Sequence, residues 1–431
     1  MKNISKFQIA VLGIFGVFII VGILIFALGK TGGGGSVVPL LVWGTMPNTE
    51  FSEVISKTGL DKNETLKIDY VQKSKDNFDI EFLEALASGI GPDLFFLSSD
   101  SLLKYKDRVF VVPFSSFSEG DFTKSFIEGA EVFLVDEGVS GFPVLVDPLV
   151  MYWNRDIFNS EGLVAPPRFW DEIYNLATNL THRDSSSELT RSGVALGEYG
   201  NVSNAFEILS TLIMQAGNPI TKRVSGGVQV VLNQKFNLPT SPAEQSLSFY
   251  TGFSNSDKTF YSWNRSLPRS RDYFLSGDLG VYFGLASELF ELRDKNPNLN
   301  FDVAMIPQTK EVGKSVVYGR VEAIMINKQS RNIPSAFLLA RALSGDFAVS
   351  ALSKIKSLPG TRRDLLSEKP ERAYMEVFFA SAIIAKPWLS PDMSATRLIF
   401  KDMIESVTGG RARTSEAVNR AYVELNSLLS F

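Results

Sequence analysis

The chain has 431 residues but contains no cysteine and only one histidine. Without cysteine there can be no disulfide bond, thiolate zinc site, cysteine nucleophile or lipid-modified cysteine anchor. The single histidine, His182, lies in the polar run "THRDSSSELTRS" (181–192), which favours a solvated loop position. Serine–histidine triads and histidine metal sites are therefore unsuited to this sequence.

An excess of one charge is also missing. Lysine and arginine together number 43, aspartate and glutamate 47, and the formal net charge is −4. Both signs are interspersed, with neither a basic face nor an arginine-rich tail in the sequence, so no binding to nucleic acid is predicted. The segment "DKNETLKIDY" (61–70) resembles a calcium loop in its acidity but lacks the central glycine and the ligand spacing. The sequence therefore predicts no metal and no cofactor.

One long apolar run is present, "FQIAVLGIFGVFIIVGILIFALG" (7–29). A helix of this length reaches roughly 30–35 Å, enough to cross a bilayer. Lys2 and Lys6 precede the run and only Lys30 follows closely, which favours a cytoplasmic segment 1–6 and an extracytoplasmic remainder. A cleaved signal peptide is the alternative, because "ALG" at its end is a small-x-small triplet, although the run exceeds a usual signal core.

The rest of the chain is expected to fold outside the membrane in two domains. Residues 30–36 include "TGGGGS", which predicts a flexible linker, so the folded part starts near Val37. A chain of this length with 45% apolar residues exceeds what one hydrophobic core usually supports. The expected arrangement is a single-pass membrane anchor followed by two extracytoplasmic domains.

The first part of the folded region alternates strand and helix signals. Residues 37–44 and 65–72 have strand patterns, 78–89 has helical spacing, and "GPDLFFL" (91–97) is a strand after a tight turn. This order predicts a parallel βαβ sheet, in which ligands bind beyond the carboxyl ends of the strands. An ordinary exit from strand to loop is the alternative. The residues expected at that edge are Thr45, Met46, Ser98, Ser99 and Asp100.

The remaining segments continue the pattern. Asp147-Pro148, inside the apolar stretch 141–153, marks a point where the chain could cross between domains. Strands are predicted within 192–201, 273–284, 300–308 and 315–327, helices at 204–216 and 241–253, and mostly helix after 327.

Nine segments, taken in order, resemble the extracytoplasmic solute-binding proteins of ABC importers, in the group that includes maltodextrin- and other oligosaccharide-binding proteins. None is specific alone, but together they span about residues 37–431. They are "LVWG" (41–44), "LASGIGPDLFFLSSD" (86–100), "GFPVLVDPLVMYWNRDIF" (141–158), "PRFWDEI" (167–173), "FLSGDLGVYFG" (274–284), "FDVAMIP" (301–307), "GRVEAIMINKQS" (319–330), "LPGTRRDL" (358–365) and "GGRARTSEAVNRAYVELNSLL" (409–429).

The resemblance implies an α/β, two-lobe periplasmic-binding-protein-like (type II) fold. Because the chain crosses between the lobes more than once, each lobe is discontinuous. Lobe one is predicted at 37–147 plus 320–375, and lobe two at 148–319 plus 376–431. Solute that contacts both lobes only when they are shut makes binding and closure one event.

The resemblance also implies cleft residues. Asp147 matches a position where family members often carry a carboxylate that accepts hydrogen bonds from solute hydroxyls. Trp43 and Trp153, inside strand patterns, are interpreted as core. Many oligosaccharide binders place a tryptophan after the segment "VYFG", whereas this chain has "LAS" (285–287). The expected solute-binding residues are Thr45, Met46, Ser98, Ser99, Asp100, Asp147, Tyr199, Asn201, Trp263, Ala286 and Trp388.

The predicted function is capture of a small polar solute, with carbohydrate favoured, for the permease subunits of an ABC importer. No enzymatic activity is predicted. A glycoside hydrolase using Asp100 and Asp147 was the enzymatic alternative, but pairs among 47 acidic residues carry little weight. A ligand-sensing receptor or adhesin built on the same two-lobe fold is the other alternative.

Overall fold

The computed structural model describes residues 37–63, 65–310 and 315–429. The predicted cytoplasmic segment 1–6, membrane span 7–29 and linker 30–36 lie outside them. Among the described residues, no single helix is long and apolar enough to cross a membrane. Helices α12 (Ile333–Leu343) and α13 (Asp346–Lys356), bent by 59°, meet that criterion only as a pair.

The first three long strands form the predicted parallel βαβ sheet. β1 (Val38–Gly44) lies between β2 (Leu66–Gln72) and β3 (Leu94–Ser98), parallel to both. Helices α2 (Asn48–Thr58) and α3 (Phe78–Ala87) connect them. Leu40, Val42 and Phe95 have no exposed surface, because alternating apolar residues point into layers on both faces. We call the part of the molecule around these strands the first lobe.

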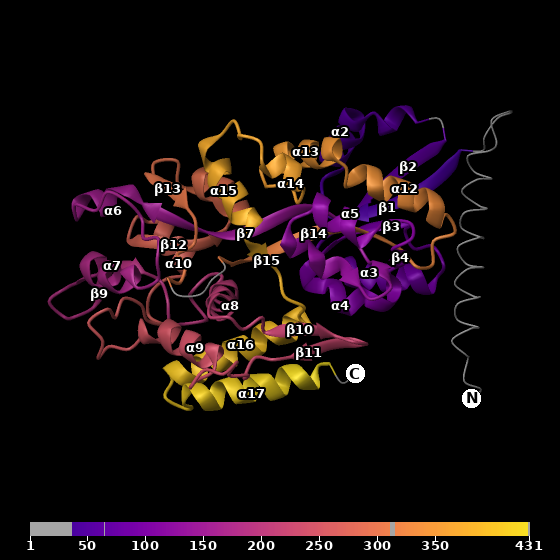
Figure 1. Ribbon diagram of the computed structural model, residues 1–431. Coiled ribbons are helices and arrows are strands. Elements are labelled where there is room, and N and C mark those ends of the chain that lie inside the picture. Colours follow the sequence, from indigo (N-terminus) through magenta and orange to yellow (C-terminus); the bar gives the residue numbers. More distant parts are fainter. Residues whose placement is uncertain (1–36, 64, 311–314, 430–431) are drawn as a thin grey trace.

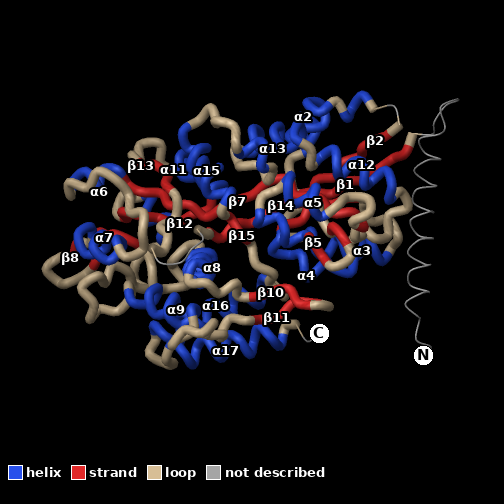
Figure 2. The backbone as a smooth tube through the Cα atoms, in the orientation of Figure 1, coloured by secondary structure: helices blue, strands red, loops and turns tan. Residues whose placement is uncertain are grey.

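One long strand passes from the first lobe into the second. β7 (Phe142–Asn154) pairs with β14 (Val317–Ile326) along its first half and with β12 (Leu279–Leu285) and β13 (Phe301–Ala304) along its second. The change of partner falls at the predicted crossing, since Pro148 pairs with Gly319 and the next residue with Leu285. A ten-stranded sheet therefore runs continuously through both lobes (Figures 1 and 2).

The second lobe continues this sheet from β12 through β9 (Leu189–Val194) to the two-residue edge strand β8 (His182–Arg183). His182 is exposed, as predicted, although it lies in this edge strand rather than in a loop. Below the sheet in Figure 1 lies a layer of helices with the hairpin β10–β11 beside it. This layer comprises α8 (Ala205–Gln215), α9 (Pro242–Gly252), α16 (Met393–Thr408), α17 (Thr414–Ser427), β10 (Thr221–Val224) and β11 (Gly227–Val230).

Short elements complete both lobes. In the first lobe they are α4 (Leu102–Tyr105), β4 (Val112–Pro113), α5 (Glu119–Ser125), β5 (Leu134–Val135), β6 (Gly138–Val139) and α14 (Arg363–Leu366). Helix α15 (Ala373–Ile383) packs against β7 and β13, and β15 (Ala385–Lys386) pairs with β14. In the second lobe they are α6 (Arg155–Ser160), α7 (Glu172–Leu180), α10 (Ser270–Leu275) and α11 (Leu289–Lys295). The expected helical stretch after residue 327 is confirmed from α12 to α17, with β15 as a short interruption.

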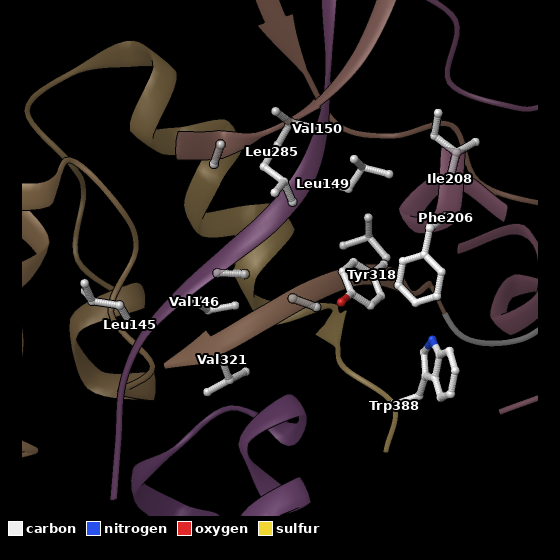
Figure 3. Packing of buried hydrophobic residues seen from close by; sticks show 14 of the residues in the cluster. Leu145, Val146, Leu149, Val150, Phe206, Ile208, Leu285, Tyr318, Val321 and Trp388 are labelled. Carbon is white, nitrogen blue, oxygen red and sulfur yellow. The ribbon is translucent and has the colours of Figure 1, made fainter. Parts of the chain in front are cut away.

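An aromatic cluster fixes the crossing strands on the lower helical layer (Figure 3). Phe206 of α8 packs edge-on against Tyr318 of β14, with ring centroids 5.7 Å apart, and against Phe400 of α16 at 4.9 Å. Trp388, in the segment before α16, stacks on Phe400 at 5.9 Å. Because these rings come from three separated parts of the chain, their packing positions α8 and α16 under β14.

The segments 128–133 and 385–386 are in close contact. A substitution at Gly129 tests how tightly β15 packs against the first of these segments. A Cβ atom on Gly129 would lie 2.1 Å from the carbonyl oxygen of Ala385, a backbone atom that has no room to move. We expect Gly129→Ala to destabilise the protein by about 1–3 kcal/mol, the usual cost of overpacking. Gly120→Ala is the matched control, because the nearest atom to its Cβ is 4.0 Å away. Thermal unfolding with equal midpoints for both variants would contradict this packing.

Candidate functional site

The carboxyl edge of the first-lobe sheet meets the second lobe at a cluster of charged side chains. Arg320 of β14 directs Nε toward Asp100, with 3.2 Å to its Oδ2, and Nη2 toward Glu207, with 2.6 Å to its Oε1. Asp100 follows β3 in the first lobe, whereas Glu207 belongs to α8 below the sheet. A single guanidinium therefore contacts carboxylates from both lobes. We call Asp100, Glu207, Tyr318, Arg320 and Arg397 the inter-lobe network.

Glu207 is the most deeply buried member of this network, with 1% of its side chain exposed. Its Oε1 also accepts a hydrogen bond of 2.5 Å from Nη2 of Arg397 on α16. Burial alone would raise the pKa of this carboxyl group, but Arg397 and Arg320 together lower it below its ordinary value. Glu207 is therefore an anion held between two cations at neutral pH.

Asp100 owes its position to the turn that follows β3. The side chain of Ser98 accepts a hydrogen bond from the backbone N–H of Asp100 and begins a 3-10 turn there. The Tyr318 hydroxyl donates to Oδ1 of Asp100 at 2.8 Å. Burial raises the pKa of Asp100, although the neighbouring Arg320 opposes that change. Ser99 binds β14 directly: its hydroxyl oxygen accepts a hydrogen bond from the Val321 N–H at 3.1 Å.

Asp147 lies at the crossing point and is directly opposite Arg320 in the strand register. It accepts two hydrogen bonds from Ser287, one from the backbone N–H at 3.0 Å and one from the hydroxyl at 2.7 Å. Burial raises the pKa of Asp147, and the bonds from Ser287 work against that change. The turn after β12, where the sequence lacks the expected tryptophan, is thus tied to the crossing strand by a serine.

The network remains open to solvent on one side. The side chains of Arg320 and Arg397 are 27% and 33% exposed, while Asp100 is 12% exposed. Guanidinium N–H groups in fixed positions can donate to hydroxyl or carbonyl oxygens of a solute. Within the described ranges, no cluster of three or more histidines and acidic residues is arranged to hold a metal ion.

A separate cavity of about 580 Å³ lies between the first lobe and the β10–β11 hairpin, and no residue of the inter-lobe network lines it. Its first-lobe wall includes Leu102 and Leu103, which follow Asp100, and its opposite wall is the β10–β11 hairpin. Arg223 of that hairpin donates a hydrogen bond of 2.5 Å to the Val132 carbonyl in the first lobe. The hairpin therefore reaches across and bounds the cavity on that side.

Several of the predicted site residues come together in this region. Asp100 and Asp147 both face Arg320, and the Tyr199 hydroxyl accepts a hydrogen bond from Arg397. Ser98 and Ser99 shape the turn under Asp100. Other predicted residues are placed by their strands at the same edge but differ in exposure: Thr45 is exposed, whereas Met46 and Ala286 are buried.

The tryptophan predictions need correction. Trp263 was expected to be exposed toward a cleft, but it has no exposed surface, and its indole N–H donates to Asn201 at 3.1 Å. Asn201 in turn donates to the carbonyls of Asn264 and Leu267, so this pair holds loops together. Trp388 is 3% exposed and belongs to the aromatic cluster. Neither ring presents a free face. Trp43 lies in the core, as predicted. Trp153 is partly buried and packs against the hydrophobic core.

Sequence reasoning missed Glu207, Arg320, Arg397 and Ser287. A signal existed for two of them. Glu207 is a lone acid in the apolar helix "AFEILSTLIM", and Arg320 is a lone base in the strand "VYGRVEAIMI". Charges in segments otherwise buried are seldom left without a partner, which favours pairing between them.

Two α/β lobes joined by shared crossing strands, with a polar site between them, define the two-lobe binding-protein class. Residues 47–346, more than half of the chain, match the family model of bacterial extracellular solute-binding proteins. The chain belongs to that family, as the sequence resemblance predicted.

Related proteins and structures support the same fold. A protein of Brucella abortus (strain 2308) described as a binding protein is 19% identical over 325 residues, covering 74% of each chain. A cyclo/maltodextrin-binding protein complexed with maltotetraose superposes with a TM-score of 0.75 at 16% identity, covering 92% of this chain and 98% of that one. An ABC substrate-binding protein of Listeria monocytogenes in complex with cycloalternan gives a TM-score of 0.66 at 15% identity, covering 92% and 100%. The expected two-lobe α/β fold is confirmed.

The inter-lobe network predicts a pH-dependent stability. Glu207→Gln removes the anion between two guanidinium groups and should destabilise the protein by about 3–5 kcal/mol at pH 7, as broken buried pairs do. The folded-state pKa of Glu207 is depressed, so its contribution is present above its ordinary pKa of 4.5 and is lost as the pH falls through the depressed value. The difference from the parent protein should therefore shrink at pH 4 and below.

Urea denaturation of the full chain at pH 7 and pH 4 measures this difference. Glu84→Gln makes the same change at an exposed position on α3 and should cost nothing at either pH. A Glu207→Gln penalty that stays constant with pH would show that Glu207 acts by packing alone.

Proposed function

We propose that this chain is a membrane-tethered extracytoplasmic receptor that captures a small polar solute, with an oligosaccharide as the favoured class. Captured solute passes to the permease subunits of an ABC importer. The observation that carries the proposal is the position of Arg320, which touches carboxylates of both lobes beside the open side of the site. A solute bound there contacts both lobes only when they are closed, so its differential affinity favours the closed state.

Carbohydrate is favoured by the chemistry of the site and by the relatives. Partly exposed guanidinium groups beside the carboxylate of Asp100 suit the hydroxyl groups of a sugar, which need both donors and acceptors. The relatives named above are recorded with maltotetraose and cycloalternan, and a third structure of the same fold, with TM-score 0.65, holds mannobiose. The proposal includes no covalent step and no cofactor.

The site differs from a stacking platform for sugar rings. Trp263 and Trp388 are buried, and Leu285, Ala286 and Ser287 occupy the turn after β12. The half-buried ring of Tyr199 remains beside Arg397. Affinity must then come mainly from hydrogen bonds to the network, which makes the site depend more on hydroxyl geometry than on ring faces.

The membrane tether is the other part of the proposal. The apolar run 7–29 has the length of a single membrane span, and the lysines that flank it favour a cell-membrane location with residues after Lys30 outside. A tether keeps the receptor beside its importer at high effective concentration.

A ligand panel tests the proposal. The full chain in detergent is heated with millimolar monosaccharides, oligosaccharides, polyols, amino acids or short peptides. A solute at a thousand times its dissociation constant stabilises the native state by about 4 kcal/mol, which raises the unfolding temperature clearly. We expect one sugar class to give this shift, and Asp147→Asn to reduce it, because Asp147 faces Arg320 and holds the turn after β12.

The control variant is Asp257→Asn, which changes an exposed carboxylate in the second lobe and should leave the shift intact. Stabilisation by amino acids or peptides alone would replace the sugar assignment. A flat response to every class would favour the alternative, a tethered ligand-sensing receptor or adhesin with the same fold.

A further inference from the structure

The edge of the first-lobe sheet opposite to the candidate site carries a cluster of unbalanced positive charge. β1, β2 and β3 begin at this edge, and the antiparallel β14 ends there. The loops that meet at it come from three distant parts of the sequence. We call its exposed residues the amino edge: Val37, Ile90, Arg108, Lys328 and Arg331.

Backbone hydrogen bonds join these loops into one surface. The N–H of Lys328 donates to the Arg108 carbonyl at 2.8 Å. The N–H of Asn327 donates to the Asp93 carbonyl at 2.9 Å, which brings in the turn that contains Ile90. The Asn332 side chain donates to the Pro39 carbonyl at 3.4 Å and so places Arg331 beside the start of β1. The amino edge is therefore built by the sheet and does not depend on a single loop.

The chemistry of this surface is basic and partly apolar. Arg108, Lys328 and Arg331 are exposed, and none of them forms an ion pair with another described residue. Of the nearby acids, Asp93 is already occupied, accepting from the Leu41 N–H at 2.9 Å and from Ser330, while exposed Asp107 adjoins Arg108. In the loop before β2, exposed Asp61 is matched by exposed Lys62, so among the described residues Asp107 is left to offset Arg108, Lys328 and Arg331 in a protein of net charge −4.

Apolar side chains stand out beside these bases. Ile90 is 71% exposed and Val37 is 53% exposed. Single exposed apolar residues are common on soluble proteins. Their position among unpaired basic side chains, however, is the composition that lies at a membrane surface, where cations meet lipid phosphates and apolar groups enter the head-group region.

The start of the folded region at Val37 indicates which partner this surface meets, namely the membrane. Val37 follows the apolar run 7–29 after only seven residues, 30–36. Seven residues reach at most about 25 Å when fully extended. The four strand ends of the amino edge span roughly 15 Å, since neighbouring strands lie about 4.8 Å apart. If the run crosses a bilayer, all of the amino edge lies within reach of the lipid head groups.

We propose that the amino edge binds anionic phospholipid head groups of the membrane that holds residues 7–29. This inference rests on the tether in the proposed function. Arg108, Lys328 and Arg331 contact the phosphates, and Ile90 enters the interface. Because β1 is seven residues long and rises about 3.3 Å per residue, the first-lobe part of the site is held roughly 23 Å above the membrane.

The absence of cysteine makes the test direct, because Ile90→Cys gives a single labelling position in the full chain. The variant, carrying an environment-sensitive dye, is reconstituted into vesicles of phosphatidylcholine with or without phosphatidylglycerol. We expect a blue shift and quenching by brominated lipid only when phosphatidylglycerol is present. Salt at 1 M, where the screening length is about 3 Å, should abolish both signals.

Two matched controls make the outcome specific. Val423→Cys, at a 62%-exposed position on α17, should give neither signal in either membrane. The triple reversal of Arg108, Lys328 and Arg331 to glutamate should abolish the Ile90→Cys signal. Reversal of Lys235, Lys258 and Lys401, which are exposed in the second lobe, changes the charge equally and should preserve it.

Vesicle flotation separates failure of the tether from failure of the amino edge. A chain that floats with both vesicle types but shows the same Ile90→Cys emission in each keeps its tether and overturns the proposal for the amino edge. A chain that floats with neither type overturns the tether, and the amino edge with it. Ligand-induced thermal shifts in detergent would still stand in either case, because they do not require a membrane.

Discussion

The rest of the structure depends on one partly buried guanidinium, that of Arg320. Arg320 lies on a strand that is shared by both lobes, and its charge is balanced by Asp100 on one side and Glu207 on the other. Removing charged groups from water is costly unless each has a partner, so the three residues constrain one another. The aromatic cluster around Phe206 and Tyr318 then fixes α8 beneath β14 and keeps Glu207 in reach. Ionic and apolar contacts thus specify the same placement of the two lobes.

The connection between the lobes combines a continuous backbone ladder with charged side chains that both lobes share. β7 and β14 are hydrogen-bonded to each other across the crossing point and give the lobes a continuous connection. The charged side chains beside that connection are shared between lobes, so any relative movement changes the distances on which their balance depends. A solute that offers hydroxyl groups can replace part of this balance, whereas an apolar molecule cannot.

Much of the fold could be predicted from the sequence because it depends on local patterns. Alternation, terminal glycines and strand spacing predicted β1, β2 and β3, which are confirmed, and β7 changes its partner strand at the predicted crossing point, Asp147-Pro148. The site was harder, because its members come from segments up to 297 positions apart, the separation of Asp100 and Arg397. The prediction that Trp263 is exposed was wrong for a related reason. Its neighbours in the sequence are polar, but a loop distant in sequence, which includes Asn201, covers its ring. The basic amino edge was invisible in the sequence because its three cations come from two loops more than 200 positions apart, Arg108 from one and Lys328 and Arg331 from the other.

The β10–β11 hairpin has a consequence for how a molecule can enter. Arg223 joins the hairpin to the Val132 carbonyl, and the crossing strands join the lobes elsewhere, so the cavity is enclosed on two sides by the chain itself. Widening the cavity at the hairpin requires that bond to break. A substitution at Arg223 therefore acts on a wall of this cavity, whereas a substitution at Arg320 acts on the charges that join the lobes elsewhere.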